Sequence, residues 1–305
     1  MLYDLMIVGA GPAGMTAALY ALRAGKSVLL LDGNGYGGQI AQSQGVENYP
    51  GIPFVNGMDL ADSLMGQIRD LGVDFRFENV TEVNAIEKGY YEVRTDFSRY
   101  EGRSVILATG LTHRRLNAPG EERWIGRGIS FCAVCDGAFF RQKEVAVVGG
   151  GNTAVQDALY LADICSKVYL IHRRDGFRAE EAVLTKARAN ARIEFITNTV
   201  VSEFCGDTAF TGLRLENKLT GEVRDLAVAG VFEAVGLEPR NQPFAKLIAL
   251  DDAGYALAGE ECTTVLPGVF VAGDCRAKRI RQLTTATADG TVAALAALDY
   301  LDSLG

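Results

Sequence analysis

The chain alternates between short apolar runs and glycine-rich or polar breaks, a pattern typical of buried strands connected by helices. Residues 5–8, Leu-Met-Ile-Val, form the first apolar run, and Ala- and Leu-rich sequence follows as far as Gly25. Residues 27–32, Ser-Val-Leu-Leu-Leu-Asp, form a second apolar run. Strand, helix and strand in this order predict a βαβ unit and therefore an α/β fold.

The break after the first run carries three glycines, Gly9, Gly11 and Gly14. In a dinucleotide-binding turn, the first glycine makes the tight bend, the second lets the backbone approach a pyrophosphate, and the third lets the helix pack against the strand. The phosphates then lie at the helix N-terminus, where free N–H groups favour negative charge. The second strand ends at Asp32, which can accept hydrogen bonds from a ribose. This site is predicted to bind FAD or NAD.

A second copy of the pattern begins at residues 145–148, Val-Ala-Val-Val. It continues through Gly149, Gly151 and Ala154 into helical sequence, and then into a strand that ends at His172. In both copies 23 residues separate the first glycine from the strand end, so the two copies share one register.

The strand ends of the two copies carry opposite chemistry. The first ends in Asp32, whereas the second ends in His172 followed by Arg173 and Arg174, with Arg178 further on. An acid there favours a free ribose 2′-hydroxyl, and arginines favour a 2′-phosphate through charge-assisted hydrogen bonds. The second site is therefore predicted to bind NADPH; the alternative for the arginines is a solvated, charged strand end.

Residues 130–140, SFCAVCDGAFF, contain a pair of cysteines, Cys132 and Cys135, with Asp136 directly behind them. A zinc site would need two further ligands, but the chain has no second CxxC, and its only histidines are His113 and His172. A structural disulfide across two residues closes too small a loop to stabilise the fold much. CxxC pairs form and break a disulfide readily, which predicts a redox pair.

Composition limits the class of partner. The chain has 305 residues, of which 48% are hydrophobic and 22% charged, enough for about two globular domains. A formal charge of −8 and a pI near 5.0 argue against nucleic acid or an anionic membrane surface as partner. No apolar span reaches the roughly 18 residues of a membrane helix, and no leader is recognisable, so a cytoplasmic location is expected. Cys165, Cys205, Cys262 and Cys275 are expected to be small buried residues.

These motifs together resemble those of the bacterial-type, low-molecular-weight thioredoxin reductases over essentially the whole chain. The matching segments occur in the family's order: GAGPAG, GGQI followed by GVENYPG, ATG, CAVCD, GGGNTA, HRRDGFRA, GVFVAGD and RQLTTATADG. The resemblance is specific because few flavoproteins combine CxxCD with a GGGNTA strand directly behind it. Two departures are Gln156-Asp157, where the family often has two glutamates, and the CAVC form of the redox motif.

The resemblance implies an NADPH-dependent flavoprotein disulfide reductase that is a homodimer. Hydride would pass from NADPH to FAD, and electrons would pass on through a Cys132–Cys135 disulfide to thioredoxin. By resemblance, Cys135 lies against the flavin, Cys132 exchanges with the substrate disulfide, and Asp136 moves the proton. The alternative for Asp136 is a helix N-cap.

The resemblance also assigns the cofactor-binding residues. Those expected at FAD are Gly9, Gly11, Pro12, Ala13, Gly14, Asp32, Gly38, Gln39, Asn48, Ala108, Thr109, Gly110, Gly273, Asp274, Arg281 and Gln282. Those expected at NADPH are Gly149, Gly151, Asn152, Thr153, Ala154, His172, Arg173, Arg174 and Arg178.

The order of the motifs predicts two Rossmann-like dinucleotide-binding domains, one inserted into the other. Residues 1–113 and 241–305 would form the FAD-binding domain, and residues 114–240 the NADPH-binding domain with the CxxC pair. Because the inserted domain carries both the disulfide and the nicotinamide, and both need the flavin, we expect the domains to rotate during turnover. The hinge is expected near 112–119 and 236–243.

Four alternatives share parts of this pattern. One is a related flavoprotein that takes electrons from ferredoxin or O2, against which the arginines argue. Another is the reductase of a peroxiredoxin, which carries extra N-terminal domains. A third is a dinucleotide-sensing regulator without enzymatic activity. The fourth is a reductase with a different disulfide partner, such as glutaredoxin, a choice that depends on the surface around Arg127, Phe139 and Phe140.

Overall fold

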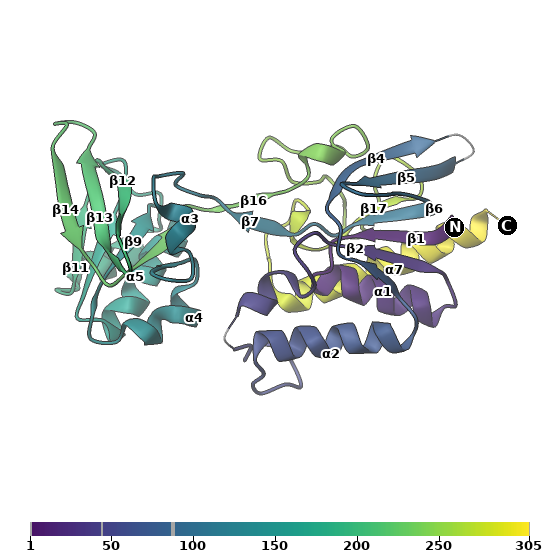
Figure 1. Ribbon diagram of the computed structural model, residues 1–305, viewed down its shortest axis with the longest axis horizontal. Coiled ribbons are helices and arrows are strands. Elements are labelled where there is room, and N and C mark those ends of the chain that lie inside the picture. Colours follow the sequence, from purple (N-terminus) through teal and green to yellow (C-terminus); the bar gives the residue numbers. More distant parts are fainter. Residues whose placement is uncertain (1, 44, 87–88, 305) are drawn as a thin grey trace. The chain divides into compact units, whose positions relative to one another are not determined.

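The computed structural model describes residues 2–43, 45–86 and 89–304, without the side chains of Gln42 and Cys135. The chain divides into two compact units (Figure 1). The first unit consists of residues 1–112 and 238–305, and the second of residues 113–237. The sequence analysis predicted residues 114–240 for the second unit, so the two boundaries differ by one and three residues. The fold is the expected α/β class, with a parallel sheet at the centre of each unit.

The first unit is built on a seven-stranded sheet in the order β3-β2-β1-β6-β5-β4, with β17 pairing with β6. The strands β3, β2, β1, β6 and β17 run parallel, whereas β4 and β5 are antiparallel. Their bounds are β1 Leu2–Val8, β2 Val28–Leu31, β3 Asp74–Arg76, β4 Val80–Ile86, β5 Tyr90–Thr95, β6 Arg99–Leu107 and β17 Val269–Val271.

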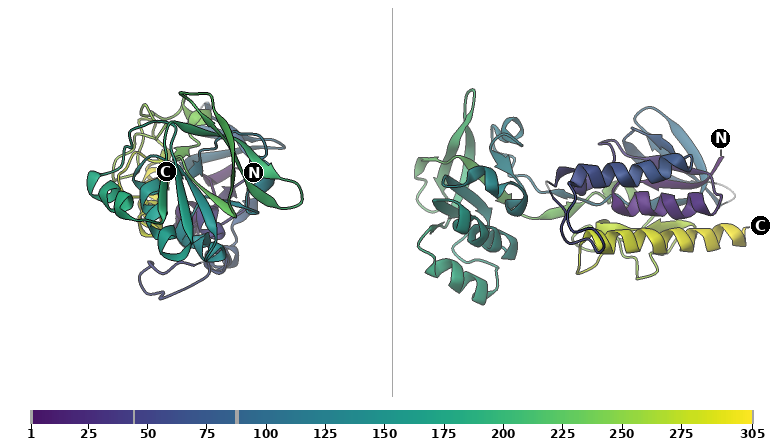
Figure 2. Two further views of the ribbon diagram at one scale, coloured as in Figure 1. Left: turned by 90° about the vertical axis from the view of Figure 1, so that its left-hand side faces the viewer. Right: turned by 90° about the horizontal axis from the view of Figure 1, so that it is seen from below.

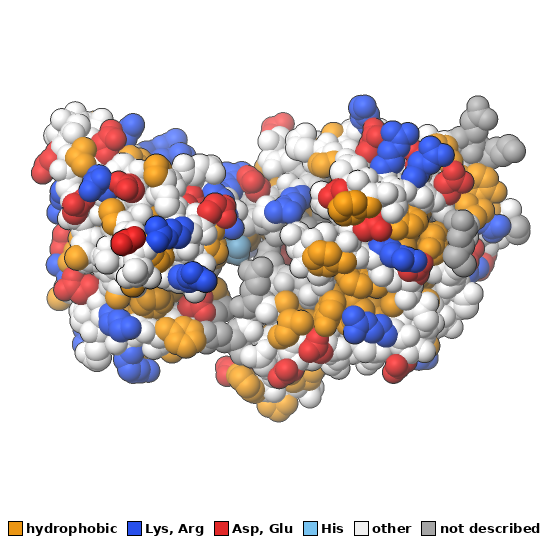
Figure 3. Space-filling model, viewed as in Figure 1, with side chains coloured by type: hydrophobic (Ala, Val, Ile, Leu, Met, Phe, Trp, Pro, Cys, Tyr) orange, Lys and Arg blue, Asp and Glu red, His pale blue; other side chains and the backbone are white. Residues whose placement is uncertain are grey.

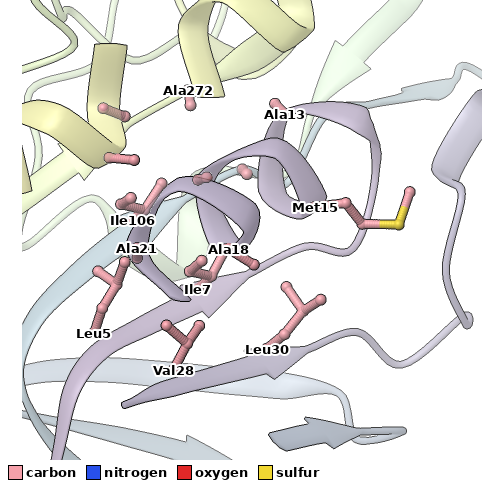
Figure 4. Close-up of a cluster of buried hydrophobic side chains, with 14 of the residues drawn as sticks. Leu5, Ile7, Ala13, Met15, Ala18, Ala21, Val28, Leu30, Ile106 and Ala272 are labelled. Atoms are coloured by element: carbon pink, nitrogen blue, oxygen red, sulfur yellow. The ribbon is translucent and has the colours of Figure 1, made fainter. Parts of the chain in front are cut away.

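Three long helices cover one side of this sheet: α1 Pro12–Arg23, α2 Gly57–Asp70 and α7 Leu283–Ser303. Helix α1 lies between α2 and α7 (Figure 2, right). The buried alanines of α1 allow this close packing, and together with Leu5, Ile7 and Ile106 they form a central core (Figure 4). None of the described helices is both long and apolar enough to cross a membrane.

The second unit contains a five-stranded parallel sheet in the order β11-β10-β9-β15-β8. Its strands are β8 Ile129–Ser130, β9 Glu144–Gly149, β10 Lys167–Ile171, β11 Ile193–Ile196 and β15 Gly230–Ala234. The helices α5 Asn152–Ile164 and α6 Glu181–Ala189 pack on one face. An antiparallel sheet of β12 Thr199–Gly206, β13 Phe210–Asn217 and β14 Val223–Ala227 packs on the other.

Short elements complete the fold. Two strands, β7 Leu111–His113 and β16 Leu237–Pro239, pair with each other where the chain passes between the units. The remaining elements are η1 Gly38–Gln42, α3 Glu121–Trp124, α4 Ala133–Asp136, η3 Gly137–Phe140, η4 Gln242–Phe244 and η5 Gly273–Cys275. On the face shown in Figure 3, acidic and basic side chains are interspersed, without a broad basic patch.

Candidate functional sites

The glycine turn of the first unit has the geometry that its three glycines predict. Gly9 has φ +108°, and a Cβ there would lie 2.2 Å from the carbonyl oxygen of Ala108. A Cβ on Gly14 would lie 1.9 Å from the carbonyl oxygen of Gly9. Gly11 differs, because the nearest atom to its Cβ position is 3.9 Å away, on Gly38. Packing therefore requires Gly9 and Gly14, whereas Gly11 leaves space in front of the α1 N-terminus.

Asp32 follows directly after β2 and braces the same turn. Its Oδ2 accepts a hydrogen bond from the Ala10 N–H at 2.9 Å, and its Oδ1 accepts one from the Asn34 N–H at 2.8 Å. A carboxylate offers about four acceptor positions, so these two bonds leave capacity for a ribose hydroxyl. The N-cap of α1 is Gly11, which provides no side-chain capping bond, so the first N–H groups of the helix face open space.

A cavity of about 270 Å³ lies in front of this turn and brings together most of the residues predicted for FAD. Its predicted members are Gly11, Pro12, Ala13, Asp32, Gly38, Gln39, Ala108, Thr109, Gly110, Gly273, Asp274, Arg281 and Gln282. Four apolar lining residues were not predicted: Ile40, Leu111, Leu283 and Ala286. Gly9 lines a neighbouring cavity that also contains Asp32 and Arg240, and Asn48 is hydrogen-bonded to Gln282 at 3.2 Å.

The segment after β17 contributes the half-buried carboxylate of Asp274 to the cavity. The Oδ1 of Asp274 is buried and has no hydrogen-bond partner in the described part of the chain, and Lys278 Nζ lies 3.4 Å from it. Burial raises the pKa of Asp274, and Lys278 opposes this shift. Arg281 donates to the Asp274 carbonyl oxygen at 3.3 Å and stacks on Tyr255, with its guanidinium carbon 4.2 Å from the ring centre.

Asp289, a residue that the sequence interpretation missed, anchors this segment to α7. It is 8% exposed, and its Oδ2 accepts hydrogen bonds from the Gly273 N–H at 3.0 Å, from Arg276 Nε at 3.1 Å and from Lys278 Nζ at 2.9 Å. Its Oδ1 accepts a further bond from Arg276 Nη2 at 2.8 Å. Asp289 therefore fixes the backbone on which Asp274 lies.

The glycine turn of the second unit is built differently. A Cβ on Gly149 would lie 2.4 Å from the Ala234 carbonyl oxygen, so β9 packs tightly on β15 at this point. His172 is 6% exposed, and its ring lies under Gly150, where a Cβ would be 2.1 Å from the ring carbon Cε1. Burial lowers the pKa of His172, and Nε2 has no hydrogen-bond partner in the described part of the chain. The histidine thus packs beneath the turn.

The three arginines that follow are exposed. Arg173, Arg174 and Arg178 form no salt bridge with any described carboxylate, and Arg178 is tied to the turn only through its N–H, which donates to the Gly150 carbonyl oxygen at 2.7 Å. Asn152, in the first turn of α5, exchanges two hydrogen bonds with Glu180. Three free guanidinium groups beside a helix N-terminus suit a phosphate ligand.

The redox segment lies between β8 and η3. Asp136 is the last residue of α4 and the N-cap residue of η3, where its side chain forms no capping hydrogen bond. Its Oδ2 instead accepts a hydrogen bond from the Ser130 hydroxyl at 2.6 Å, a partner that was not predicted. The sulfur of Cys132 is disulfide-bonded. The side chain of Cys135 lies outside the described part of the structure, and its pairing with Cys132 stays a prediction.

The other cysteines are free thiols. Cys165, Cys262 and Cys275 are buried as expected, whereas Cys205 is half-buried, because β12 lies in the outer antiparallel sheet. Burial raises the pKa of each of these four thiols, that of Cys262 to about 11. Raised pKa values make the thiolate scarce, so these cysteines are poor nucleophiles.

Comparison with known proteins identifies the class that this arrangement defines. The family model described as pyridine nucleotide-disulphide oxidoreductase matches residues 3–290. The chain is 43% identical over 304 residues to the thioredoxin reductase of Listeria monocytogenes, covering 99% of this chain and 95% of that protein. It is 42% identical over 302 residues to the bifunctional thioredoxin reductase/thioredoxin of Mycobacterium leprae, covering 98% and 66%. The crystal structure of thioredoxin reductase from Streptococcus pyogenes matches with a TM-score of 0.80 and 40% identity, covering 99% of both chains.

The chain therefore belongs to the pyridine nucleotide-disulphide oxidoreductase family. Within that family it is an enzyme of the thioredoxin reductase type, and FAD and NADPH are its cofactors. The sequence-based expectation of family, fold class and cofactors is confirmed. The first unit fits FAD, since it combines the open Gly11 turn with the cavity in front of it, and the second unit fits NADPH through its exposed arginines.

Proposed function

We propose that this enzyme reduces the disulfide of thioredoxin through a Cys132–Cys135 pair. The observation that carries the proposal is the redox segment on the unit that also bears the arginine-lined nucleotide turn. When bound, FAD supplies the redox chemistry that links a hydride donor to the two-electron reduction of a disulfide. Gly11 and Asp32 bind and orient it in the first unit, and Arg173 and Arg174 bind the 2′-phosphate of NADPH in the second.

The chain's own groups carry out the thiol–disulfide exchange. The thiolate of Cys132 attacks one sulfur of the substrate disulfide and forms a mixed disulfide with it. The other sulfur of the substrate leaves as a thiolate. The thiolate of Cys135 then attacks Cys132, so the substrate leaves as a dithiol and the enzyme disulfide re-forms. The carboxyl group of Asp136 transfers protons to and from the sulfur atoms, since each departing thiolate must be protonated.

The surface around the redox segment supports a protein as the disulfide substrate. Val134 is 67% exposed and Phe139 is 63% exposed, two apolar side chains within six residues on a charged protein. Phe140, by contrast, packs edge-on against Phe232, which fixes the segment. The Mycobacterium leprae relative joins a thioredoxin reductase and a thioredoxin in one chain, which supports thioredoxin as the partner.

Substitution of each cysteine tests this function. Cys132→Ser and Cys135→Ser should both abolish NADPH-dependent reduction of thioredoxin, while NADPH still reduces the flavin in stopped-flow measurements. Thioredoxin, glutaredoxin and oxygen offered separately to the unaltered enzyme identify the acceptor. Full thioredoxin turnover by the Cys135→Ser enzyme would overturn the proposal, and flavin that never bleaches with NADPH would favour a sensing protein.

We also infer rotation of the two units during turnover. The chain passes between them at β7 and β16, and Asn117 (φ +55°) and Gly236 (φ +112°) lie in left-handed conformations in the expected hinge segments. An engineered cross-link between the units should stop NADPH-to-thioredoxin turnover. Undiminished turnover in a fully cross-linked sample would exclude the rotation.

We further propose that the enzyme is a cytoplasmic homodimer. Helices α1 and α7 of the first unit expose apolar side chains, among them Tyr20 at 40% and Leu295 at 49%. Contact between two copies would remove these side chains from water. Leu295→Glu should therefore shift the mass in sedimentation equilibrium from two chains to one, and an unchanged mass would place the contact elsewhere.

A further inference from the structure

Ser130 occupies a rigid position next to the redox segment. It is the last residue of β8 and pairs with Phe232 of β15 in the parallel sheet. Ser130 is only 7% exposed, so its hydroxyl must find partners within the protein. The sheet thus fixes the backbone of Ser130, and only the side-chain torsion decides where the hydroxyl points.

The hydroxyl joins the cysteine loop to the acid. Ser130 Oγ accepts a hydrogen bond from the Cys132 N–H at 3.1 Å and lies 2.6 Å from Asp136 Oδ2. The carbonyl oxygen of Cys132 is further away, at 3.4 Å. Because a hydroxyl has one hydrogen, it donates to the nearer carboxylate. The Asp136 N–H donates to the Cys132 carbonyl oxygen at 3.1 Å, which closes the loop.

This arrangement accommodates both forms of the carboxyl group. When Asp136 is charged, it accepts from the Ser130 hydroxyl. When Asp136 has taken up a proton, its own O–H can donate to Ser130 Oγ, because a hydroxyl oxygen has two acceptor positions. The serine hydrogen then rotates to the Cys132 carbonyl oxygen, and no covalent bond changes.

We propose that Ser130 is a positioning residue that holds the Asp136 carboxyl group against the cysteine loop before and after each proton transfer. The inference deepens the proposed function, because it rests on Asp136 as the proton carrier. The Ser130 hydroxyl contacts Asp136 and the Cys132 backbone, and it acts through Asp136. Loss of the Ser130 hydroxyl should slow the reduction of thioredoxin and leave the reduction of the flavin by NADPH unchanged, whereas a general loss of folding would slow both steps.

The first test is Ser130→Ala in the intact holoenzyme. Reduction of the flavin by NADPH, followed in stopped flow, should keep its rate, whereas the prereduced enzyme should reduce thioredoxin about tenfold more slowly, the loss of one hydrogen bond to a charged group. The solvent deuterium isotope effect on the slow step should rise, since proton transfer then limits it. Ser202→Ala is the matched control, because that hydroxyl binds a backbone oxygen of Arg214 on another sheet.

A double-mutant cycle with Asp136→Asn separates the two hypotheses. If Asp136→Asn alone leaves the disulfide step unchanged, the proton-carrier role of Asp136 is wrong. Suppose that Asp136→Asn slows that step. If Ser130→Ala then slows the enzyme that has Asp136 but does not slow the Asp136→Asn enzyme, Ser130 acts through the acid. An Asp136→Asn enzyme that Ser130→Ala slows by the same tenfold would overturn the positioning role, as would a Ser130→Ala enzyme with the unaltered rate.

Discussion

A buried pair of carboxyl groups, Glu121 on α3 and Glu233 on β15, makes the stability of the second unit depend on pH. The two residues are 4% and 3% exposed. Burial first, and then the charge of Glu121, raise the pKa of Glu233 to about 8, while Arg115 opposes the shift. Neither oxygen of Glu233 accepts a hydrogen bond from a described residue, although a protonated Glu233 can donate one to Glu121.

The sign of the effect follows from where the proton is bound. Between the ordinary value of 4.5 and about 8, folded Glu233 keeps its proton while the unfolded chain has lost it. The folded state binds more protons in this range, so its stability falls as pH rises, by about 1.4 kcal/mol per pH unit. From pH 5 to pH 8 the loss from this one group is about 4 kcal/mol.

Glu233→Gln removes the titration and keeps the shape of the side chain. The variant should gain about 4 kcal/mol in unfolding free energy relative to the unaltered protein between pH 5 and pH 8. Urea unfolding followed by tryptophan fluorescence measures this directly, because Trp124, the chain's only tryptophan, lies on α3 with Glu121 and is 3% exposed. The matched control is Glu122→Gln, an exposed neighbour on α3. Parallel pH curves for Glu233→Gln and the unaltered protein would refute the reasoning.

Three further predictions concern the cofactors. Gly11→Ala should leave a folded protein that binds FAD at least tenfold more weakly. Gly14→Ala, whose Cβ would lie 1.9 Å from a carbonyl oxygen, should instead lower the melting temperature of the FAD-free protein. Equal changes of FAD affinity and melting temperature in the two variants would contradict the turn geometry. Asp289→Asn should weaken FAD binding in titrations of the FAD-free protein, and an unchanged dissociation constant would show that the Gly273 segment needs no anchor. Replacing Arg173 and Arg174 by alanine should raise the KM for NADPH about ten- to a hundredfold and hardly change that for NADH, and an equal rise for both would exclude a 2′-phosphate contact.

The sequence predicted the features that depend on neighbouring residues. Gly14 is constrained by the carbonyl oxygen of Gly9 in the same turn, so the spacing of these two glycines carries the information, whereas Gly9 itself is constrained by Ala108, far along the chain. The strands around the turns were also predicted, although β1 begins at Leu2, ahead of the expected Leu5, because pairing with β6 extends to its first residues. Family resemblance supplied most of the C-terminal residues at the first cavity, such as Arg281.

The residues that were missed depend on contacts between distant segments or on the direction of one side chain. Asp289 resembles an ordinary polar residue of a helix, and only the tertiary fold places Arg276 and the Gly273 N–H on it. Ser130 is close to Asp136 in sequence, yet its hydroxyl direction depends on the end of β8. Glu233 did leave a signal, since a carboxyl group interrupts the apolar run of β15, and a charge in a buried strand is rare without a partner.

The two glycine turns show how one device serves two ligands with different charges. In the first unit Asp32 braces the turn by accepting the Ala10 N–H, and the carboxylate suits a ribose with a free hydroxyl. The second unit cannot use a carboxylate at this position, because it would repel a 2′-phosphate. There the buried ring of His172 supports Gly150 by packing, which leaves Arg173 and Arg174 exposed. A hydrogen-bonded brace in the first unit thus corresponds to a packed ring in the second, and the charge beside the turn changes from negative to positive.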